Sequence, residues 1–180
     1  MPPGQSTRPT SDRAREGLFG TVLSELGTLD GRHVLDLYAG SGAVGLEALS
    51  RGAESVTLVE SDVRAVAVIK ANIKTVGLPG AKVITSRAEK FLAGPPPAPC
   101  DLVFADPPYA VTSEQVTRIL TLLAEGGWLT GEALVIVERA TRSGELDWPP
   151  AYAPGKSRRY GEATFWYGWH SAACAHAHEE

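Results

Sequence analysis

The sequence predicts an α/β fold in which a mainly parallel sheet of seven strands carries helices on both faces. Between residues 32 and 138, short apolar runs alternate with stretches that have helical spacing. A glycine-rich turn joins the first of these runs to a helix. Two later strand-like stretches, 157–161 and 163–169, leave no room for a crossover helix between them. They should therefore pair as an antiparallel hairpin at one edge of the sheet.

The composition is that of an ordinary globular protein. The chain has 180 residues, 43% of them hydrophobic and 21% charged, and this length suits a single domain. No apolar run is long enough to span a membrane, and no secretory signal is evident. The two cysteines lack the C-x-x-C spacing of redox or metal sites, which suits a reducing compartment. We therefore expect a cytoplasmic monomer with no membrane partner.

The two ends of the chain are expected to lie outside the folded domain. Residues 1–7 are rich in proline, glycine and polar side chains, and we predict that they are disordered. The single domain is predicted to span residues 8–169. Residues 170–180 carry Cys and His in an alanine-rich context that fits no standard metal site. We expect a flexible tail there and no bound metal.

The first expected helix covers residues 10–26. Thr10 or Ser11 can cap it, and Asp12 suits its first turn. Apolar side chains recur along it at helical spacing and form one stripe for the core. The stripe consists of Ala14, Leu18, Phe19, Val22, Leu23 and Leu26.

Strands and helices then alternate along the chain. The strands expected from apolar runs cover residues 32–38, 55–60, 82–85, 101–106 and 133–138. One helix is expected to end at Arg51 before Gly52, and a second to run from a cap at Ser61 or Asp62 to Gly77. A third, short helix should include Phe91 and Leu92, and a fourth should cover 113–124. Right-handed crossovers place the carboxyl ends of parallel strands on one side. The residues expected to converge there are Asp36, Glu60, Ser86 and Asp106.

The turn after the first strand has the spacing of a nucleotide-cofactor site. Gly40, Gly42 and Gly45 follow the G-x-G-x-x-G pattern, in which two glycines allow a tight turn near a ligand and the third allows close helix packing. The carboxylate of Asp36 would repel a pyrophosphate, which favours S-adenosylmethionine over a dinucleotide. Glu60, at the end of the second strand, can accept both hydroxyls of a ribose in either cofactor.

The segment Asp106-Pro107-Pro108-Tyr109 ends the fourth strand and suits chemistry on an amine. An exocyclic amine of a base is a poor nucleophile because its lone pair is delocalised into the ring. Asp106 and the Pro107 carbonyl can accept its two N–H bonds and so aim the lone pair at a methyl donor. The prolines hold these acceptors rigidly, and the Tyr109 ring can stack on the base.

The charge pattern argues for local rather than general contact with nucleic acid. The net charge of −4 disfavours indiscriminate binding but allows basic patches. Such patches lie near both ends of the sequence and after the fifth strand. The candidate contacts to a nucleic acid are Arg8, Thr10, Arg13, Tyr109, Arg139, Lys156, Arg158 and Arg159.

Four segments together resemble the class I S-adenosylmethionine-dependent methyltransferases, and within them the RsmD-like 16S ribosomal RNA guanine-N2 methyltransferases of bacteria. They are R-P-T-S-D-R-A-R-E-G-L-F from Arg8, L-D-L-Y-A-G-S-G-A-V-G-L-E-A-L-S-R-G-A from Leu35, V-E-S-D from Val59 and D-L-V-F-A-D-P-P-Y from Asp101. The resemblance runs through most of residues 8–140. Such proteins usually have a glycine-rich basic β-hairpin before the first segment, which this sequence does not contain.

The resemblance implies a Rossmann-like class I methyltransferase fold, S-adenosyl-L-methionine as cofactor, and a guanine N2 in 16S rRNA of the small ribosomal subunit as target. The implied catalytic residues are Asp106, Pro107, Pro108 and Tyr109. The candidate cofactor-binding residues are Asp36, Tyr38, Gly40, Ser41, Gly42, Glu60, Ser61, Ser86, Arg87, Ala88 and Asp106. Relatives often have Asp after the third strand; here adenine contacts would come from the Ser86 hydroxyl or from backbone amides.

Three other functions remain compatible with the motifs. D-P-P-Y serves any exocyclic amine, so a DNA adenine-N6 or cytosine-N4 methyltransferase is an alternative, although we find no separate target-recognition domain. The glycine turn with Glu60 is also compatible with an NAD-binding oxidoreductase. A non-catalytic RNA-binding assembly factor could retain the same pocket.

Overall fold

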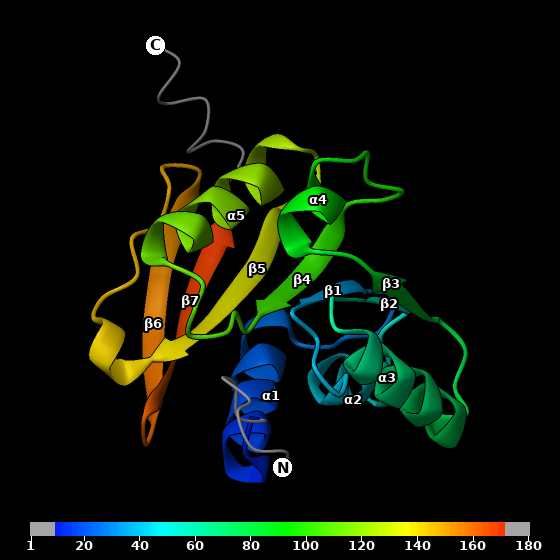
Figure 1. Cartoon of the computed structure of the whole chain (residues 1–180). Coiled ribbons are helices and arrows are strands. Elements are labelled where there is room, and N and C mark those ends of the chain that lie inside the picture. The colour runs from blue at the N-terminus through cyan, green and yellow to red at the C-terminus, as the bar shows by residue number, and fades with distance from the viewer. Residues whose placement is uncertain (1–9, 172–180) are drawn as a thin grey trace.

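The computed structural model describes residues 10–171, which form a seven-stranded sheet with helices on both faces (Figure 1). The strands lie in the order β3-β2-β1-β4-β5-β7-β6. Their bounds are β1 His33–Leu37, β2 Ser55–Glu60, β3 Ala81–Thr85, β4 Cys100–Ala105, β5 Leu129–Ala140, β6 Tyr152–Tyr160 and β7 Ala163–His170. β1 to β5 are parallel, whereas β7 is antiparallel to both β5 and β6. This arrangement confirms the predicted fold class.

The helices divide between the two faces of the sheet. They are α1 (Asp12–Leu26), α2 (Ala43–Ser50), α3 (Val63–Val76), α4 (Ala88–Leu92) and α5 (Ser113–Glu125), with a 3₁₀ turn, η1, at Thr141–Ser143. α1, α2 and α3 pack on one apolar cluster, and α4 and α5 pack on the other (Figure 1). Within residues 10–171, no helix is both long and apolar enough to cross a membrane.

Local signals in the sequence placed several helix ends correctly. The Ser11 side chain caps α1 by accepting from the Ala14 amide at 3.1 Å. Asp62 caps α3 in the same way, and Gly77 ends it in the left-handed conformation. Each of these contacts joins residues close in sequence, which is why short-range patterns predict them.

The C-terminal strands are longer than the apolar runs indicated. β5 was expected at 133–138 but covers 129–140, because its last residues pair with β7 and its first residues pass through a register shift against β4. β6 was expected at 157–161 but begins at Tyr152 and contains Pro154, a residue that an edge strand tolerates. Edge pairing therefore extended both strands beyond their hydrophobic segments.

His170 lies in β7, although the sequence pattern assigned it to the tail. Its side chain is buried, and Nδ1 lies 2.7 Å from the Thr130 carbonyl oxygen. Strand pairing with Tyr152 also holds it in the sheet. The expected disorder of residues 1–7 and most of the expected tail lie outside the described residues.

Candidate active site

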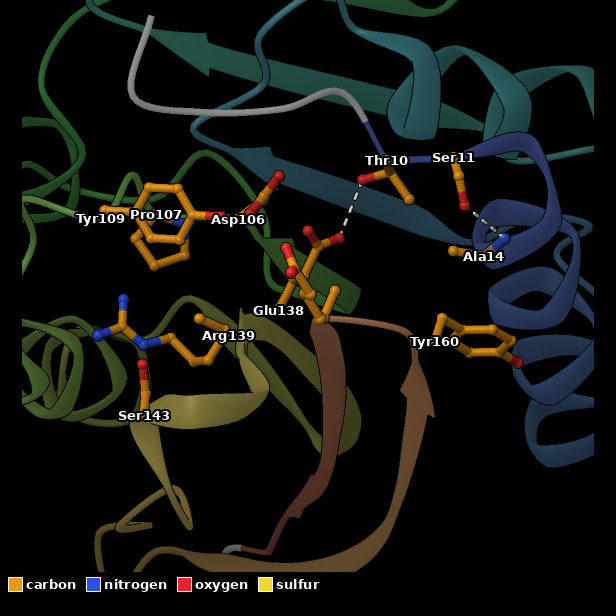
Figure 2. A pocket seen from close by; sticks show the side chains of 13 residues that line it. Thr10, Ser11, Ala14, Asp106, Pro107, Tyr109, Glu138, Arg139, Ser143 and Tyr160 are labelled. Atoms are coloured by element: carbon orange, nitrogen blue, oxygen red, sulfur yellow. Dashed lines mark hydrogen bonds between the residues drawn. The ribbon is translucent and has the colours of Figure 1, made fainter.

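A cavity of about 310 Å³ opens beside the carboxyl ends of β4 and β5 (Figure 2). Three of its lining residues, Asp106, Pro107 and Tyr109, come from the D-P-P-Y segment. Thr10, just before α1, and Glu138, near the end of β5, line it as well. The cavity therefore brings together segments from the two ends of the predicted domain.

Two carboxyl groups meet inside this cavity. Asp106 follows β4 and Glu138 lies on the neighbouring strand β5, and their side chains are hydrogen-bonded to each other. Thr10 donates its hydroxyl to Glu138 Oε1 at 2.9 Å. A hydrogen bond between two carboxyl groups needs a proton on one of them. We refer to Asp106 and Glu138 as the acid pair.

The environment of the acid pair favours retention of that proton. Burial, followed by the nearby charge of Glu138, raises the pKa of Asp106 well above its usual value. Burial also raises the pKa of Glu138, while the hydrogen bonds from Thr10 and Asp106 oppose that rise. Two carboxylates in contact cannot both ionise cheaply. These directions favour a shared proton on the Asp106 side of the pair.

Arg139 lies inside the site rather than on a free basic surface. It lines the cavity, and its Nη2 donates to the Val111 carbonyl oxygen at 3.2 Å, which ties β5 to the loop after the D-P-P-Y segment. Burial lowers the pKa of Arg139, while the charges of Tyr38 and Asp106 oppose this. In the same loop, the Tyr109 ring is 53% exposed, and the Arg142 guanidinium lies 5.4 Å from its centroid. Arg142 therefore lies over the ring, while about half of Tyr109 stays exposed.

The amino end of α1 is held over the cavity by contacts farther along the helix. Tyr160 of β6 packs against Gly17, where a Cβ would overlap the tyrosine hydroxyl. On another side, Arg15 Nε donates to Glu47 of α2 at 2.8 Å. These contacts fix α1 against the sheet and so place Thr10 beside the acid pair (Figure 2).

The glycine turn between β1 and α2 follows the predicted design. Gly40 and Gly42 have φ values of 59° and 81°, which suit glycine, and a Cβ at Gly40 would meet no atom within 4 Å. A Cβ at Gly45 would lie 2.8 Å from Val56 and 2.9 Å from Leu58. The third glycine is therefore required for the close packing of α2 on β2.

Asp36 faces the protein interior, which corrects the expectation that its carboxylate meets a ligand. The side chain is 1% exposed, and Oδ2 accepts the Gly45 amide at 3.0 Å. Burial raises the pKa of Asp36 to about 8, an effect that the Gly45 hydrogen bond opposes. The sequence pattern missed this because a strand-end acid can point either to the pocket or beneath the turn.

Glu60 closes the same turn from β2. Its Oε1 accepts the Gly40 amide at 2.9 Å, and its Oε2 accepts the Asp62 amide at 2.8 Å. Each carboxylate oxygen has two acceptor positions, so both retain one for a further donor. Asn72 of α3 supports the turn from another side by donating to the Ser41 carbonyl at 2.9 Å. The sequence pattern did not identify Asn72.

Tyr38 is strained between the two parts of the site. Among the described residues it is the one non-glycine residue with positive φ, at 58°. Its half-buried ring has a raised pKa because of burial and then the charge of Glu89, while the charges of Arg139 and Arg87 oppose this. Such a conformation costs roughly 1–3 kcal/mol and persists only where the surroundings impose it. Tyr38 directly follows β1, so this conformation starts the glycine turn.

The remaining candidate cofactor residues lie around the ends of β2 and β3. The Ser86 amide donates to the Glu60 carbonyl at 3.1 Å, and its hydroxyl donates to the Arg87 carbonyl. Arg87 is the N-cap residue before α4, and Ala88 is buried at the start of that helix. Ser61 is exposed beside Glu60.

Parallel pairing brings the two groups of candidates to one edge. β1 pairs with β2 on one side and with β4 on the other. The Asp106 amide lies 3.4 Å from the Leu37 carbonyl, and the charge of Asp36 contributes to the raised pKa of Asp106. The glycine turn and the D-P-P-Y segment therefore adjoin, as the topology predicted.

The other candidate nucleic-acid contacts do not line the cavity. Arg13 is exposed on α1, and Lys156, Arg158 and Arg159 are exposed on the edge strand β6. Arg159 Nε donates to the Gly161 carbonyl at 2.9 Å across the hairpin turn. Arg8 lies outside the described residues. Within residues 10–171, no cluster of three or more His, Cys, Asp or Glu side chains is placed to hold a metal ion.

Glu138 is a further site residue that sequence reasoning overlooked. It ends the apolar run of the fifth strand, as Glu60 ends that of the second. The same signal that identified Glu60 was therefore present. What the sequence does not show is that β5 lies next to β4, which brings Glu138 to Asp106.

Comparison with known proteins agrees with this geometry. The family described as Conserved hypothetical protein 95 matches residues 1–169. Ribosomal RNA small subunit methyltransferase D of Escherichia coli K12 is 38% identical over 167 residues, covering 92% of this chain and 80% of that protein. Among solved structures, the Escherichia coli protein yhhF has a TM-score of 0.82 at 34% identity, covering 92% of this chain and 89% of the other.

A more distant structure shows the same fold. Magnesium protoporphyrin IX methyltransferase from Synechocystis PCC 6803, solved with bound SAM, has a TM-score of 0.67 at 14% identity. It covers 88% of this chain and 79% of that one, and at this identity the likeness concerns the fold alone. The match over residues 1–169 and the 38% identity show more: this chain belongs to the Conserved hypothetical protein 95 family, the family of the ribosomal RNA small subunit methyltransferase D proteins.

Proposed function

We propose that this protein is an S-adenosyl-L-methionine-dependent methyltransferase that methylates the exocyclic N2 of a guanine in 16S rRNA of the small ribosomal subunit. The observation that carries the proposal is the adjacency of the glycine turn after β1 and the D-P-P-Y segment after β4. The name of the Escherichia coli relative supports a ribosomal RNA substrate. Guanine N2 as the accepting atom is part of the proposal.

The residues around the glycine turn fit the proposed cofactor. The space over Gly40 is open, and Glu60 keeps an acceptor position on each oxygen for ribose hydroxyls. Ser86 and Arg87 lie beside Glu60, where an adenine ring would follow the ribose. When bound, the cofactor supplies a methyl group on a positively charged sulfur. Asp36 supports the turn from below instead of touching the cofactor.

The D-P-P-Y segment would hold the target amine. The Asp106 carboxyl and the Pro107 carbonyl accept the amine N–H bonds and turn the nitrogen lone pair toward the glycine turn. The exposed face of Tyr109 stacks on the base, which is worth about 1–3 kcal/mol in comparable sites. Fixed φ angles at Pro107 and Pro108 keep the acceptors in place. Positioning and electrostatics therefore provide the catalysis.

The exposed cations complete the proposed interface. Lys156, Arg158 and Arg159 on β6, with Arg13 on α1 and Arg8 before it, would contact phosphates around the target base. Such contacts position the RNA and weaken with salt. We further propose that the protein acts as a monomer in the cytoplasm, on the small subunit or its assembly intermediate.

Incubation of the protein with radiolabelled S-adenosylmethionine and unmodified 30S particles tests the proposal. One guanine of 16S rRNA should become labelled, and primer extension should map it. Label on DNA but not on rRNA would replace the proposal with a DNA amine methyltransferase. Calorimetry with both cofactors is the matched control, because binding of NAD without binding of S-adenosylmethionine would contradict the methyltransferase function.

A further inference from the structure

We propose that Glu138 determines the choice of base: it accepts the N1–H of the target guanine while Asp106 accepts the neighbouring N2–H. This inference rests on the proposed function and deepens it. It assigns a specificity role to a residue outside the D-P-P-Y segment.

The cavity presents two acceptors side by side. Asp106, at the end of β4, and Glu138, on the neighbouring parallel strand β5, line the same cavity as Tyr109 (Figure 2). The side chain of Asp106 is hydrogen-bonded to that of Glu138. A base stacked on Tyr109 with its amine at Asp106 would bring the next atom of its edge to Glu138. The contact between the two side chains therefore places acceptors next to each other, as neighbouring donors on a base edge require.

Guanine is the base whose edge complements two acceptors. Its N1–H and N2–H groups are neighbouring donors. Adenine and cytosine each have an acceptor ring nitrogen next to the amine, so an acceptor at Glu138 would face an acceptor. Sites built to bond a particular donor discriminate strongly against analogues that lack it, because the buried partner stays unpaired.

The side chain of Glu138 is positioned by a residue outside the D-P-P-Y segment. The Thr10 hydroxyl donates to its Oε1 at 2.9 Å, and Thr10 is placed by the docking of α1. The pair keeps one proton between Asp106 and Glu138. When guanine binds, a free acceptor position on each carboxyl group takes one N–H of the base, while the shared proton stays within the pair. The complex therefore does not place two negative charges side by side.

The other polar groups of the cavity do not provide this function. Arg139 donates to the Val111 carbonyl and has only donors, so it cannot read N1–H. Tyr160 packs against Gly17 of α1. Glu162 also lines the cavity, but it lies in the turn between β6 and β7 and not on a strand next to β4. Glu138 is thus the acceptor that the structure places next to Asp106.

The test compares two bases at the methylated position of 30S particles: guanine and 2-aminopurine. 2-Aminopurine keeps the N2 amine but has an acceptor at N1. The wild-type protein should methylate guanine about tenfold to a hundredfold more efficiently in kcat/KM. Glu138→Gln puts an amide donor at this position, so it should lower guanine methylation by a similar factor and raise the relative use of 2-aminopurine.

Glu132→Gln provides the matched control, because Glu132 is exposed on the same strand and loses the same charge. It should keep the wild-type ratio of guanine to 2-aminopurine. S-adenosylmethionine affinity by calorimetry and the unfolding midpoint report whether Glu138→Gln is folded. An unchanged ratio in Glu138→Gln, or an equal loss on both bases, would overturn the inference while guanine methylation by the wild type still supports the proposed function. No methylation of rRNA by the wild type would overturn both.

Discussion

The acidic side chains at the two halves of the sheet edge are held in different ways. On the β1–β2 side, Asp36 accepts from the Gly45 amide of α2, and Glu60 accepts from the Gly40 and Asp62 amides. At the ends of β4 and β5, Asp106 and Glu138 bond to each other, and Glu138 also accepts from the Thr10 hydroxyl. Backbone amides stay where the chain places them, whereas side-chain partners can be exchanged for a ligand.

This difference predicts separate roles for the two halves of the sheet edge. The first half of the edge is a rigid support, and changes to it should alter stability. The second half is a cavity with exchangeable hydrogen bonds, and changes to it should alter activity. The following variants test this division in order of decreasing expected effect.

Asp106→Ala should give the largest effect. Loss of the acceptor for the target amine should lower kcat by about 10²–10³-fold, comparable to the loss of one preorganised transition-state contact. Glu138 loses its contact with Asp106 but keeps the hydrogen bond from Thr10, so the thermal unfolding midpoint should stay near that of the wild type. Methylation assays and circular dichroism measure the two quantities. Asp147→Ala, at an exposed position, should leave both unchanged, and wild-type turnover in Asp106→Ala would refute the role of Asp106.

Gly45→Ala should destabilise the support. The added Cβ would lie 2.8 Å from Val56 and 2.9 Å from Leu58, so α2 must shift, at a cost of about 1–3 kcal/mol in the free energy of unfolding. Urea titration measures this. Gly20→Ala on α1 is the control, because its Cβ would meet nothing within 4 Å, and it should stabilise by about 0.5–1 kcal/mol. Equal stability of the two variants would contradict the close packing at Gly45.

Asp36→Asn should remove a pH dependence of stability. Burial raises the pKa of Asp36 to about 8 in the folded protein, far above the value in an unfolded chain. Between those two values the folded state holds the extra proton, so this group lowers the free energy of unfolding as pH rises, by about 1.4 kcal/mol per pH unit. The loss is complete above the folded pKa. The asparagine of the variant cannot titrate, so the free energy of unfolding of the variant lacks this loss.

Urea titrations of both proteins at pH 6, 7 and 8 measure this effect. The free energy of unfolding of Asp36→Asn should rise relative to that of the wild type at each step in pH. The contributions of the other titratable groups are the same in both proteins and cancel in the difference. Asp147→Asn, at an exposed position, controls for the change in net charge. A constant difference between Asp36→Asn and the wild type would show that Asp36 does not titrate in this range.

Thr10→Val should have the smallest effect and should act on activity. It removes the hydroxyl that orients Glu138, a contribution of about 1 kcal/mol, or about fivefold in kcat/KM. Thr10→Ser keeps the hydroxyl and should retain most of the activity. Steady-state assays with 30S particles distinguish the two variants. If both lose the same activity, the methyl group of Thr10 rather than its hydrogen bond is what matters.

The sequence by itself determined the local structural features of this protein, namely its helix caps, turns and strand ends. Helix caps within Thr10-Ser11 and Ser61-Asp62, the turn at Gly40 and Gly42, and the end of β4 at the D-P-P-Y segment all follow from residues within a few positions of one another; the structure selects Ser11 and Asp62 as the caps. The alternation of strands and helices also determined the parallel sheet and its shared edge. Short-range hydrogen bonds and backbone sterics depend on residues that are neighbours in the sequence, so the sequence alone predicts them.

Only the tertiary structure decided where the acidic side chains at the strand ends point and which groups they bond. It turned Asp36 inward, because the close packing of α2 at Gly45 brings an amide over the end of β1. It joined Thr10 to Glu138 across 128 positions of sequence, and it brought Glu138 to Asp106 by placing β5 next to β4. The direction and partner of a strand-end carboxylate depend on which elements pack around it, and that packing is a property of the whole fold.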